Sequence, residues 1–274
     1  MARELSDVLH YMLPDAGTER APSHEGTAVH RAPETGALCP LAVPVGERDV
    51  VRVAFVWNLT VEIARAARNA LLLVPDDPAL EPLRESLPAP ASLEEGVGPE
   101  FAFSGAQDLG ALARDARDLG HGRPERGPTL APTLVPLRWI RPDPDGAQLL
   151  RRPLLFATPD ASDLQSTQTV LERIFEAAPD AEPGVTIHGV TTIEEAERTF
   201  ERLALRCETG LGRPLRSYGL LLDDLQVYRA VVDRRSVASS QPHSLAARAL
   251  ADVARLLLAD HASPPPGAKT AATP

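Results

Sequence analysis

Two short apolar runs, separated by a helix-length segment, constrain the fold of this chain more than any other feature. Residues 38–45 and 70–74 are continuous apolar runs of the length of a strand, which is typical of strands buried on both faces. Between them, residues 49–68 repeat apolar side chains at helical spacing. Strand, helix and strand in this order form a βαβ unit, and such a unit requires a parallel sheet.

The same alternation returns from residue 153 onward. Strands are predicted at 153–157, 184–190 and 217–222, and helices at 162–178, 193–209, 227–234 and 244–259. The stretch 75–130 is rich in Pro and Gly and has one clear helical segment, 108–119. A further strand is predicted at 134–140, although Pro136 lies inside it. The whole pattern predicts an α/β fold with a three-layer, doubly wound, mostly parallel sheet across residues 38–260.

The two ends of the chain have a different character. Residues 1–13 are predicted to form an amphipathic helix that Pro14 ends, and its apolar face consists of Leu5, Val8, Leu9, Met12 and Leu13. Residues 14–37 are predicted to be a flexible linker, and residues 261–274 a disordered tail. So short a helix needs a docking surface to stay folded. It either binds a protein partner in a helix-in-groove mode or folds back on its own domain, and the sequence leaves both open.

Charge and cysteine content exclude several classes of function. The 28 basic and 38 acidic residues give a net charge of -10, which disfavours nucleic acid and anionic membranes as partners because both are polyanions. Two distant cysteines form neither a disulfide framework nor a metal cluster. The N-terminus has no apolar signal region, and no apolar run reaches the roughly 18–20 residues of a membrane span. We therefore expect a cytoplasmic protein.

The first strand-to-helix turn is where a doubly wound fold binds phosphate. This turn reads Gly46, Glu47, Arg48, Asp49, Val50, Val51, Arg52 and Val53. Together with Asn58-Leu59 and the run from Leu71 to Asp77, it resembles the opening βαβ unit of MinD/ParA-type P-loop ATPases, which reads Gly-Lys-Gly-Gly-Val-Gly-Lys-Thr here. The resemblance places Gly46 on the first glycine, Arg52 on the phosphate-binding lysine and Val53 on the magnesium-binding threonine. It implies a P-loop NTPase-like fold.

The departures from that motif fall on the residues that carry its chemistry. Arg48, Asp49 and Val51 replace glycines, although a phosphate loop needs a bare backbone that approaches the phosphates closely. Asp49 also puts a negative charge where a polyanion would bind. Glu47 replaces the lysine that, in this family, reaches the partner's nucleotide across a dimer. Val53 lacks the hydroxyl that would bind Mg²⁺, and the planar head of Arg52 is not equivalent to a lysine ammonium.

Later motifs of the family are also incomplete. Pro75 stands on the first aspartate of the second motif, of which Asp77 is the remnant. The third motif should end in an aspartate, but the nearest candidate, residues 134–138, has none. His188 stands where relatives carry an asparagine that reads adenine. The C-terminal half keeps the family's order and spacing, for example at 158–160 and 196–200, and is most similar to the flagellar-number branch.

These observations predict a pseudo-ATPase. We expect a non-catalytic regulatory or scaffold protein of the MinD/ParA type, without a cofactor, that acts through a protein partner. A homodimer is compatible with this expectation, and no membrane partner is expected. A DNA-associated segregation factor is a third hypothesis, and the net charge of -10 counts against it. The alternative is an enzyme: a divergent ATPase that still binds ATP with Mg²⁺ and takes part in cellular positioning, such as division, segregation or motility.

Overall fold

Parallel strands alternate with helices along the computed structural model, which describes residues 38–46, 49–67, 69–80, 99–121, 129–233 and 235–262. The first half consists of β1 (Leu38–Val45), α2 (Val50–Ala67), β2 (Leu71–Pro75), η1 (Pro78–Leu80), β3 (Glu100–Ser104), α4 (Leu109–His121), β4 (Thr129–Pro136) and η4 (Leu137–Trp139). The second half consists of β5 (Leu154–Ala157), α5 (Ala161–Ala177), β6 (Gly184–Val190), α6 (Ile193–Leu211), β7 (Arg216–Leu222), α7 (Leu225–Val232), α8 (Val237–Ser240) and α9 (Leu245–Ala262).

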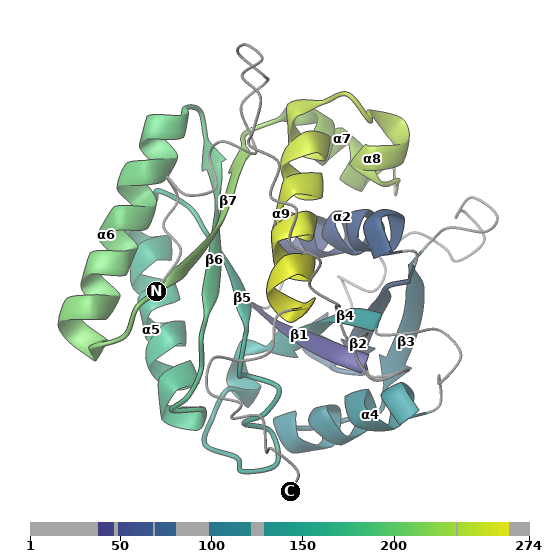
Figure 1. Ribbon diagram of the computed structural model, residues 1–274, viewed down its shortest axis with the longest axis vertical. Helices are drawn as coiled ribbons and strands as arrows, with labels where there is room; N and C mark the ends of the chain where they lie inside the picture. The colour runs from purple at the N-terminus through teal and green to yellow at the C-terminus, as the bar shows by residue number, and fades with distance from the viewer. Residues whose placement is uncertain are drawn as a thin grey trace, which may run out of the picture.

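Helices cover both faces of the strands. Figure 1 shows α5 and α6 on one side of β5, β6 and β7, with α2 and α9 on the other. Helix α4 packs on the first four strands from the side opposite α2. The layers are therefore helix, sheet and helix, as the sequence predicts for a doubly wound α/β fold.

The strands divide into two hydrogen-bonded sheets rather than one. In the described residues the orders are β1-β4-β2-β3 and β5-β6-β7, and every pairing is parallel. Strands β1 and β5 contact each other, but no ladder joins them. We call the two parts the N-terminal sheet and the C-terminal sheet.

Four prolines explain where the backbone pairing fails. Successive residues of a strand direct their N–H groups to alternate sides, so Pro40 and Pro44 of β1 face the same side, as do Pro132 and Pro136 of β4. Strands β1 and β4 pair over all eight residues, which requires that the prolines, having no N–H, face away from this ladder. Pro40 and Pro44 then face β5, where no ladder forms. Pro132 and Pro136 face β2, where pairing is limited to Leu73 opposite Thr133 and one isolated bridge between Ala70 and Leu130.

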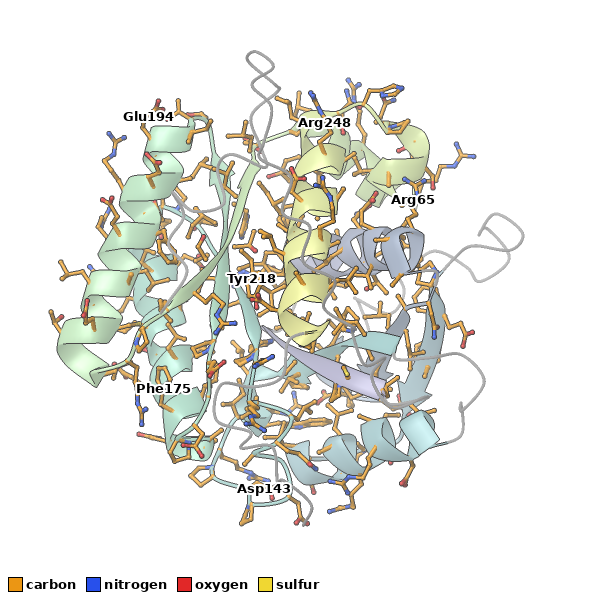
Figure 2. All side chains as sticks on the ribbon, in the orientation of Figure 1. Arg65, Asp143, Phe175, Glu194, Tyr218 and Arg248 are labelled. Atoms are coloured by element: carbon orange, nitrogen blue, oxygen red, sulfur yellow. The ribbon has the colours of Figure 1, made fainter. Side chains whose placement is uncertain are left out.

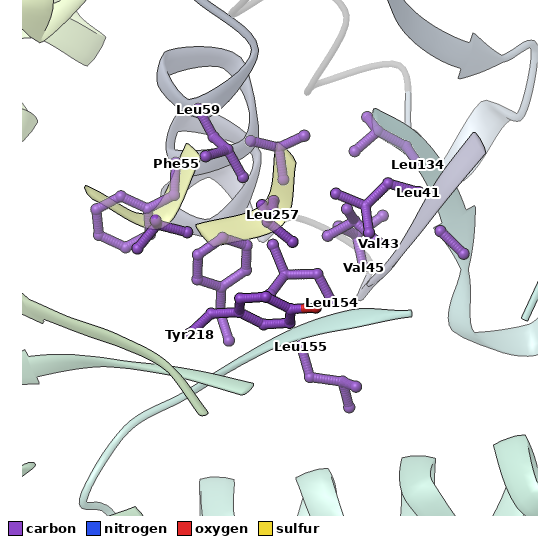
Figure 3. Packing of buried hydrophobic residues seen from close by; sticks show 14 of the residues in the cluster. Leu41, Val43, Val45, Phe55, Leu59, Leu134, Leu154, Leu155, Tyr218 and Leu257 are labelled. Atoms are coloured by element: carbon purple, nitrogen blue, oxygen red, sulfur yellow. The ribbon is translucent and has the colours of Figure 1, made fainter. Parts of the chain in front are cut away.

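Side chains join the two sheets where the backbone does not. Figure 3 shows Leu41 and Val43 of β1, Phe55 of α2 and Leu154 of β5 in one apolar cluster. Phe55 stacks on Phe156 of β5 with 5.7 Å between ring centroids. The two sheets thus share a single core, and α9 packs on both α2 and β7 across it.

The structure corrects some predicted elements. The strand predicted at 134–140 is β4, which begins at Thr129 and ends at Pro136, and a 3₁₀ turn follows it. Pro132 does not prevent β4 from starting at Thr129, because the N–H group that proline lacks would lie on the side away from β1 and is not needed for that ladder. Strand β3 and the short helix α8 were not predicted. Helix α9 continues to Ala262. Cys39 and Cys207 are both free thiols.

Several predictions concern residues that the structure does not describe. The helix predicted at 1–13, the linker at 14–37 and the tail beyond Ala262 all lie outside the described residues. Among the helices that are described, none combines the length and apolar character needed to cross a membrane.

Candidate functional site

The predicted phosphate loop lies at the carboxyl end of β1, as expected, but half of it is helix. β1 ends at Val45 and α2 begins at Val50, so residues 46–49 alone connect them. Val50, Val51, Arg52 and Val53 form the first turn of α2. Glu47 and Arg48 lie outside the described residues.

Gly46 does not use the conformational freedom that a phosphate loop requires of its glycines. Its backbone is not in the left-handed region, unlike that of Gly189, Gly212 and Gly219. A Cβ built on Gly46 would meet Leu137 Cδ1 at 3.7 Å, an ordinary van der Waals distance. A side chain would therefore fit at this position.

Asp49 occupies the N-terminus of α2 with the protein's own negative charge. Its carbonyl oxygen accepts a hydrogen bond from Val53 N–H at 3.1 Å, and its Oδ1 accepts one from Arg52 N–H at 3.2 Å. This is the geometry of a helix N-cap, in which a carboxylate satisfies the free N–H groups of the first turn. A bound phosphate would need the same N–H groups and the same end of the helix dipole.

Two carboxylates bind the guanidinium of Arg52. Arg52 Nη1 lies 3.0 Å from Asp49 Oδ2, and Arg52 Nη2 contacts Asp163 Oδ1 of α5. The other oxygen of Asp163 accepts hydrogen bonds from Thr158 N–H at 2.7 Å and Thr158 Oγ1 at 3.0 Å. Arg52 and both carboxylates keep only 20% of their side-chain surface exposed. The cation at the predicted phosphate position is thus paired inside the protein, across the junction of the two sheets.

Asp77, the predicted remnant of the second motif, is also paired. It lies just beyond β2, its side chain is fully buried, and both carboxylate oxygens contact Arg138 Nη2. Arg138 belongs to η4, directly after β4. This is the strand end at which the sequence lacks the aspartate of the third motif, so an arginine stands there and binds Asp77 instead.

Among the described residues, these two ion-paired groups together have no surplus of positive charge. Asp49, Asp77 and Asp163 contribute three negative charges, and Arg52 and Arg138 two positive ones, for a formal sum of -1. Within the described part of the chain, no group of His, Cys, Asp or Glu residues is arranged to hold a metal ion. The charges of these five side chains nearly cancel, whereas a polyphosphate site needs uncompensated positive charge.

His188 lies near the carboxyl end of β6, beside this cluster. Its ring meets the ring of Phe55 edge-on at 5.0 Å, and its Nε2 has no hydrogen-bond partner. Burial lowers the pKa of His188 to about 4; the charge of Arg52 adds to this, and that of Asp163 opposes it. The imidazole is therefore neutral at pH 7 and packs as an aromatic ring of the core.

The sequence predicted some of these residues and missed others. Asp49, Arg52, Asp77 and His188 were selected from the chain, and the structure brings them to one edge of the strands. Asp163 and Arg138 were missed as their partners. Opposite charges near the ends of parallel strands could have suggested the two pairs, but the sequence alone does not fix which ends are adjacent. The predicted partner-binding residues of 1–13 lie outside the described residues.

Comparisons with known proteins support the fold. Matching structures include MinD of the MinC:MinD cell division complex of Aquifex aeolicus, with 10% identity, 81% of this chain and 96% of that one covered, and a TM-score of 0.57. MinD of Pyrococcus horikoshii with Mg-ADP gives 12% identity, 82% and 99% coverage, and a TM-score of 0.54. A ParA family ATPase of Chlorobium tepidum gives 13% identity, 80% and 99% coverage, and a TM-score of 0.53.

No family model and no curated protein matches the sequence. The predicted resemblance to MinD/ParA-type ATPases is confirmed at the level of structure, because these proteins are the structural neighbours over most of the chain. Nothing in these neighbours tests the flagellar-number branch, which stays a prediction.

Proposed function

We propose, from its MinD/ParA-type fold, that this chain is a pseudo-ATPase: a non-catalytic regulatory or scaffold protein of the cytoplasm that acts through protein partners. In this proposal the fold is kept, and it serves to bind proteins because the altered phosphate loop no longer suits a nucleotide. It is carried by one observation, the pairing of Arg52 with both Asp49 and Asp163.

That pairing opposes nucleotide binding in two ways. A phosphate that approached Arg52 would have to displace the two carboxylates that already bind its Nη1 and Nη2 groups. It would also meet the charge of Asp49 at the helix N-terminus. A like-charge contact at 4 Å costs about 4 kcal/mol at an effective dielectric constant of 20. The residues present therefore do not fit a triphosphate.

The metal that accompanies a triphosphate lacks ligands as well. Val53 has no hydroxyl, and Asp77 is occupied by Arg138. Catalysis of phosphoryl transfer depends on positioning and on charge stabilisation by a metal and fixed cations. We infer that this chain has neither ATP nor Mg²⁺ as a cofactor.

A nucleotide titration of the full chain tests the proposal. We expect that ATP, ADP and GTP with Mg²⁺ produce no heat of binding and no shift in melting temperature, because a ligand that does not bind the folded state cannot stabilise it. Micromolar binding that Arg52→Ala abolishes would contradict the proposal. Arg65→Ala is the matched control, since Arg65 lies on the same helix and pairs with Glu62 away from the loop.

The alternative is a divergent ATPase that takes part in cellular positioning. Two observations favour it: a cation persists at position 52, and a MinD with the same fold was solved with Mg-ADP. In this alternative, nucleotide binding would move Asp49 and Asp163 away from Arg52. The titration above separates the two functions.

The partner is proposed to be a protein. Support comes from a structural neighbour that was solved in a complex of two different proteins, MinC and MinD. The net charge of -10 continues to disfavour nucleic acid. A homodimer is compatible with the fold, but a dimer that depends on bound ATP is not compatible with the cluster around Arg52.

A further inference from the structure

Exposed apolar side chains gather on one short helix and its neighbour. In the described residues, six large hydrophobic side chains are exposed. Four of them lie together in sequence or space: Leu225, Tyr228 and Val232 on α7, and Leu245 at the start of α9. We call these four residues the α7 patch. The other two, Phe103 and Leu205, lie on β3 and α6.

The α7 patch is one continuous face. At 100° per residue, Leu225, Tyr228 and Val232 project within about 60° of one another, while Val227 and Ala230 of the same helix are buried. Asp224 accepts a hydrogen bond from Ala246 N–H at 3.4 Å, which brings the start of α9 against the start of α7. Figure 1 shows these two ends side by side. Val232 is 81% exposed and Leu225 70%, so the chain described here leaves this face uncovered.

Basic residues border the patch. Arg229, Arg235 and Arg248 are all exposed, and Figure 2 shows Arg248 at the end of α9 that meets α7. Asp223, which binds Tyr228, Asp224 and Asp233 are acidic residues nearby, so the described border of the patch carries charges of both signs. The exposed arginines can pair with carboxylates that flank the apolar face of a helix packed on the patch.

The chain itself contains such a segment. Residues 3–13 carry five apolar residues at helical spacing, with Glu4 and Asp7 among the polar positions. Their formal charge is -1, from these two acids and Arg3. A segment of this length cannot sustain a helix in water without a surface to cover. Its apolar face thus matches the apolar α7 patch, and its acidic residues can pair with the exposed arginines beside that patch.

Residues 14–37 are long enough to cover the length of a strand. Helix α7 follows β7 after two residues, so it begins at the carboxyl edge of the strands, whereas the chain enters β1 at the amino edge. Eight residues of β1 span about 26 Å at about 3.3 Å per residue. Residues 14–37 are 24 residues, and a flexible chain of that length has a root-mean-square span of about 25–30 Å.

We propose that residues 3–13 dock as a helix on the α7 patch of the same chain. The apolar face of the segment covers Leu225, Tyr228, Val232 and Leu245, and its acidic residues face the bordering arginines. The sequence left two roles open for residues 3–13, binding a partner or folding back on their own domain, and the proposed docking is the second. It also gives the proposed regulator a built-in control, because any partner that binds residues 3–13 or the α7 patch must first separate them. The inference does not depend on whether nucleotide binds.

Hydrogen exchange of the full chain, read by mass spectrometry, tests the docking. We expect amides of residues 5–13 to exchange at least tenfold more slowly than in a free peptide of residues 1–20. Val232→Asp and Leu225→Asp should each remove this protection, because a charge in the patch opposes burial of an apolar face. Leu205→Asp is the matched control, an exposed leucine of α6 remote from the patch, and should leave the protection intact.

Three results would overturn the proposal. The first is an unprotected segment in the unmodified chain. The second is protection that survives both patch substitutions, with exchange of β6 unchanged as the check on folding. The third is protection that rises with protein concentration between 1 and 100 µM, chosen as roughly bracketing weak association, because a second copy would then be the occupant.

Discussion

The two sheets differ in how their strands are held together. The C-terminal sheet has no proline within its strands, and capped helices flank it, with Asp160 at the N-cap of α5 and Thr192 at that of α6. The N-terminal sheet carries two prolines in each of two strands. Its backbone pairing is complete between β1 and β4 and between β2 and β3, but not between β4 and β2. Ladders between proline-free strands, with register shifts between β6 and β7, hold the C-terminal sheet together, and side-chain contacts connect the N-terminal sheet to it.

The difference bears on function. In the proposed pseudo-ATPase, the altered loop follows β1 of the N-terminal sheet. Asp163 lies on α5, which covers the C-terminal sheet, and His188 lies on β6 of that sheet; the first contacts Arg52 and the second adjoins it. Side chains that meet across the junction of the two sheets thus occupy the position where a nucleotide phosphate would bind. Four measurements test this difference between the two sheets.

The largest effect is expected from Phe156→Ala. Phe156 is 3% exposed and stacks on Phe55 across the junction, so its removal should lower the free energy of unfolding by about 3–4 kcal/mol in urea titrations. Phe103→Ala is the control, because Phe103 is 56% exposed, and should cost less than about 1 kcal/mol. A loss below about 1 kcal/mol for Phe156→Ala would show that the shared core does not join the sheets.

Arg52→Ala should have the next largest effect and lower the free energy of unfolding by about 2 kcal/mol. It leaves the carboxylates of Asp49 and Asp163 facing each other in a partly buried site without their cation. A double-mutant cycle with Asp163→Ala should give a coupling of about 1–2 kcal/mol. Arg114→Ala, which breaks an exposed pair with Asp145, should cost under about 1 kcal/mol. Zero coupling in the cycle would mean that this ion pair does not connect the two sheets.

Protonation of His188 at low pH should lower the free energy of unfolding by a similar but smaller amount. Its pKa is about 4 in the folded protein against about 6.5 in an unfolded chain. The unfolded state therefore binds the proton first as the pH falls, and stability is lost from pH 6.5 down to pH 4. The loss between pH 7 and pH 5 is about 2 kcal/mol. His188→Gln should show a correspondingly shallower decline in chemical unfolding; an equal slope would place the imidazole in water.

The smallest effect is expected from Gly46→Ala. The position has room for a Cβ and no left-handed backbone, so the change in free energy of unfolding should stay within about 0.5 kcal/mol. Gly184→Ala is the contrasting control in the C-terminal sheet, because its Cβ would lie 2.0 Å from the ring of Tyr218. It should cost about 1–3 kcal/mol. A severe loss at Gly46 would indicate a strained loop of the phosphate-binding kind.

Local signals in the sequence were sufficient for most elements. Apolar runs and helical periodicity located β1, α2 and β6 to within about two residues, because such patterns depend on neighbours along the chain. Strand β3 was missed because its five residues lie in a Pro- and Gly-rich region and form an edge strand. The start of β4 was missed because a proline is tolerated on one side of a strand and not on the other.

By itself, the sequence determined the alternation of strands and helices and the loss of the glycines and the hydroxyl that a phosphate loop uses. Only the tertiary structure decided what replaces them. Arg52 and its partner Asp163 are 111 positions apart, and Arg138 and Asp77 are 61 apart. Periodicity reports how a segment contacts water and core, whereas an ion pair depends on which strand ends become neighbours in the folded sheet. That adjacency exists only once both sheets have packed on their common core.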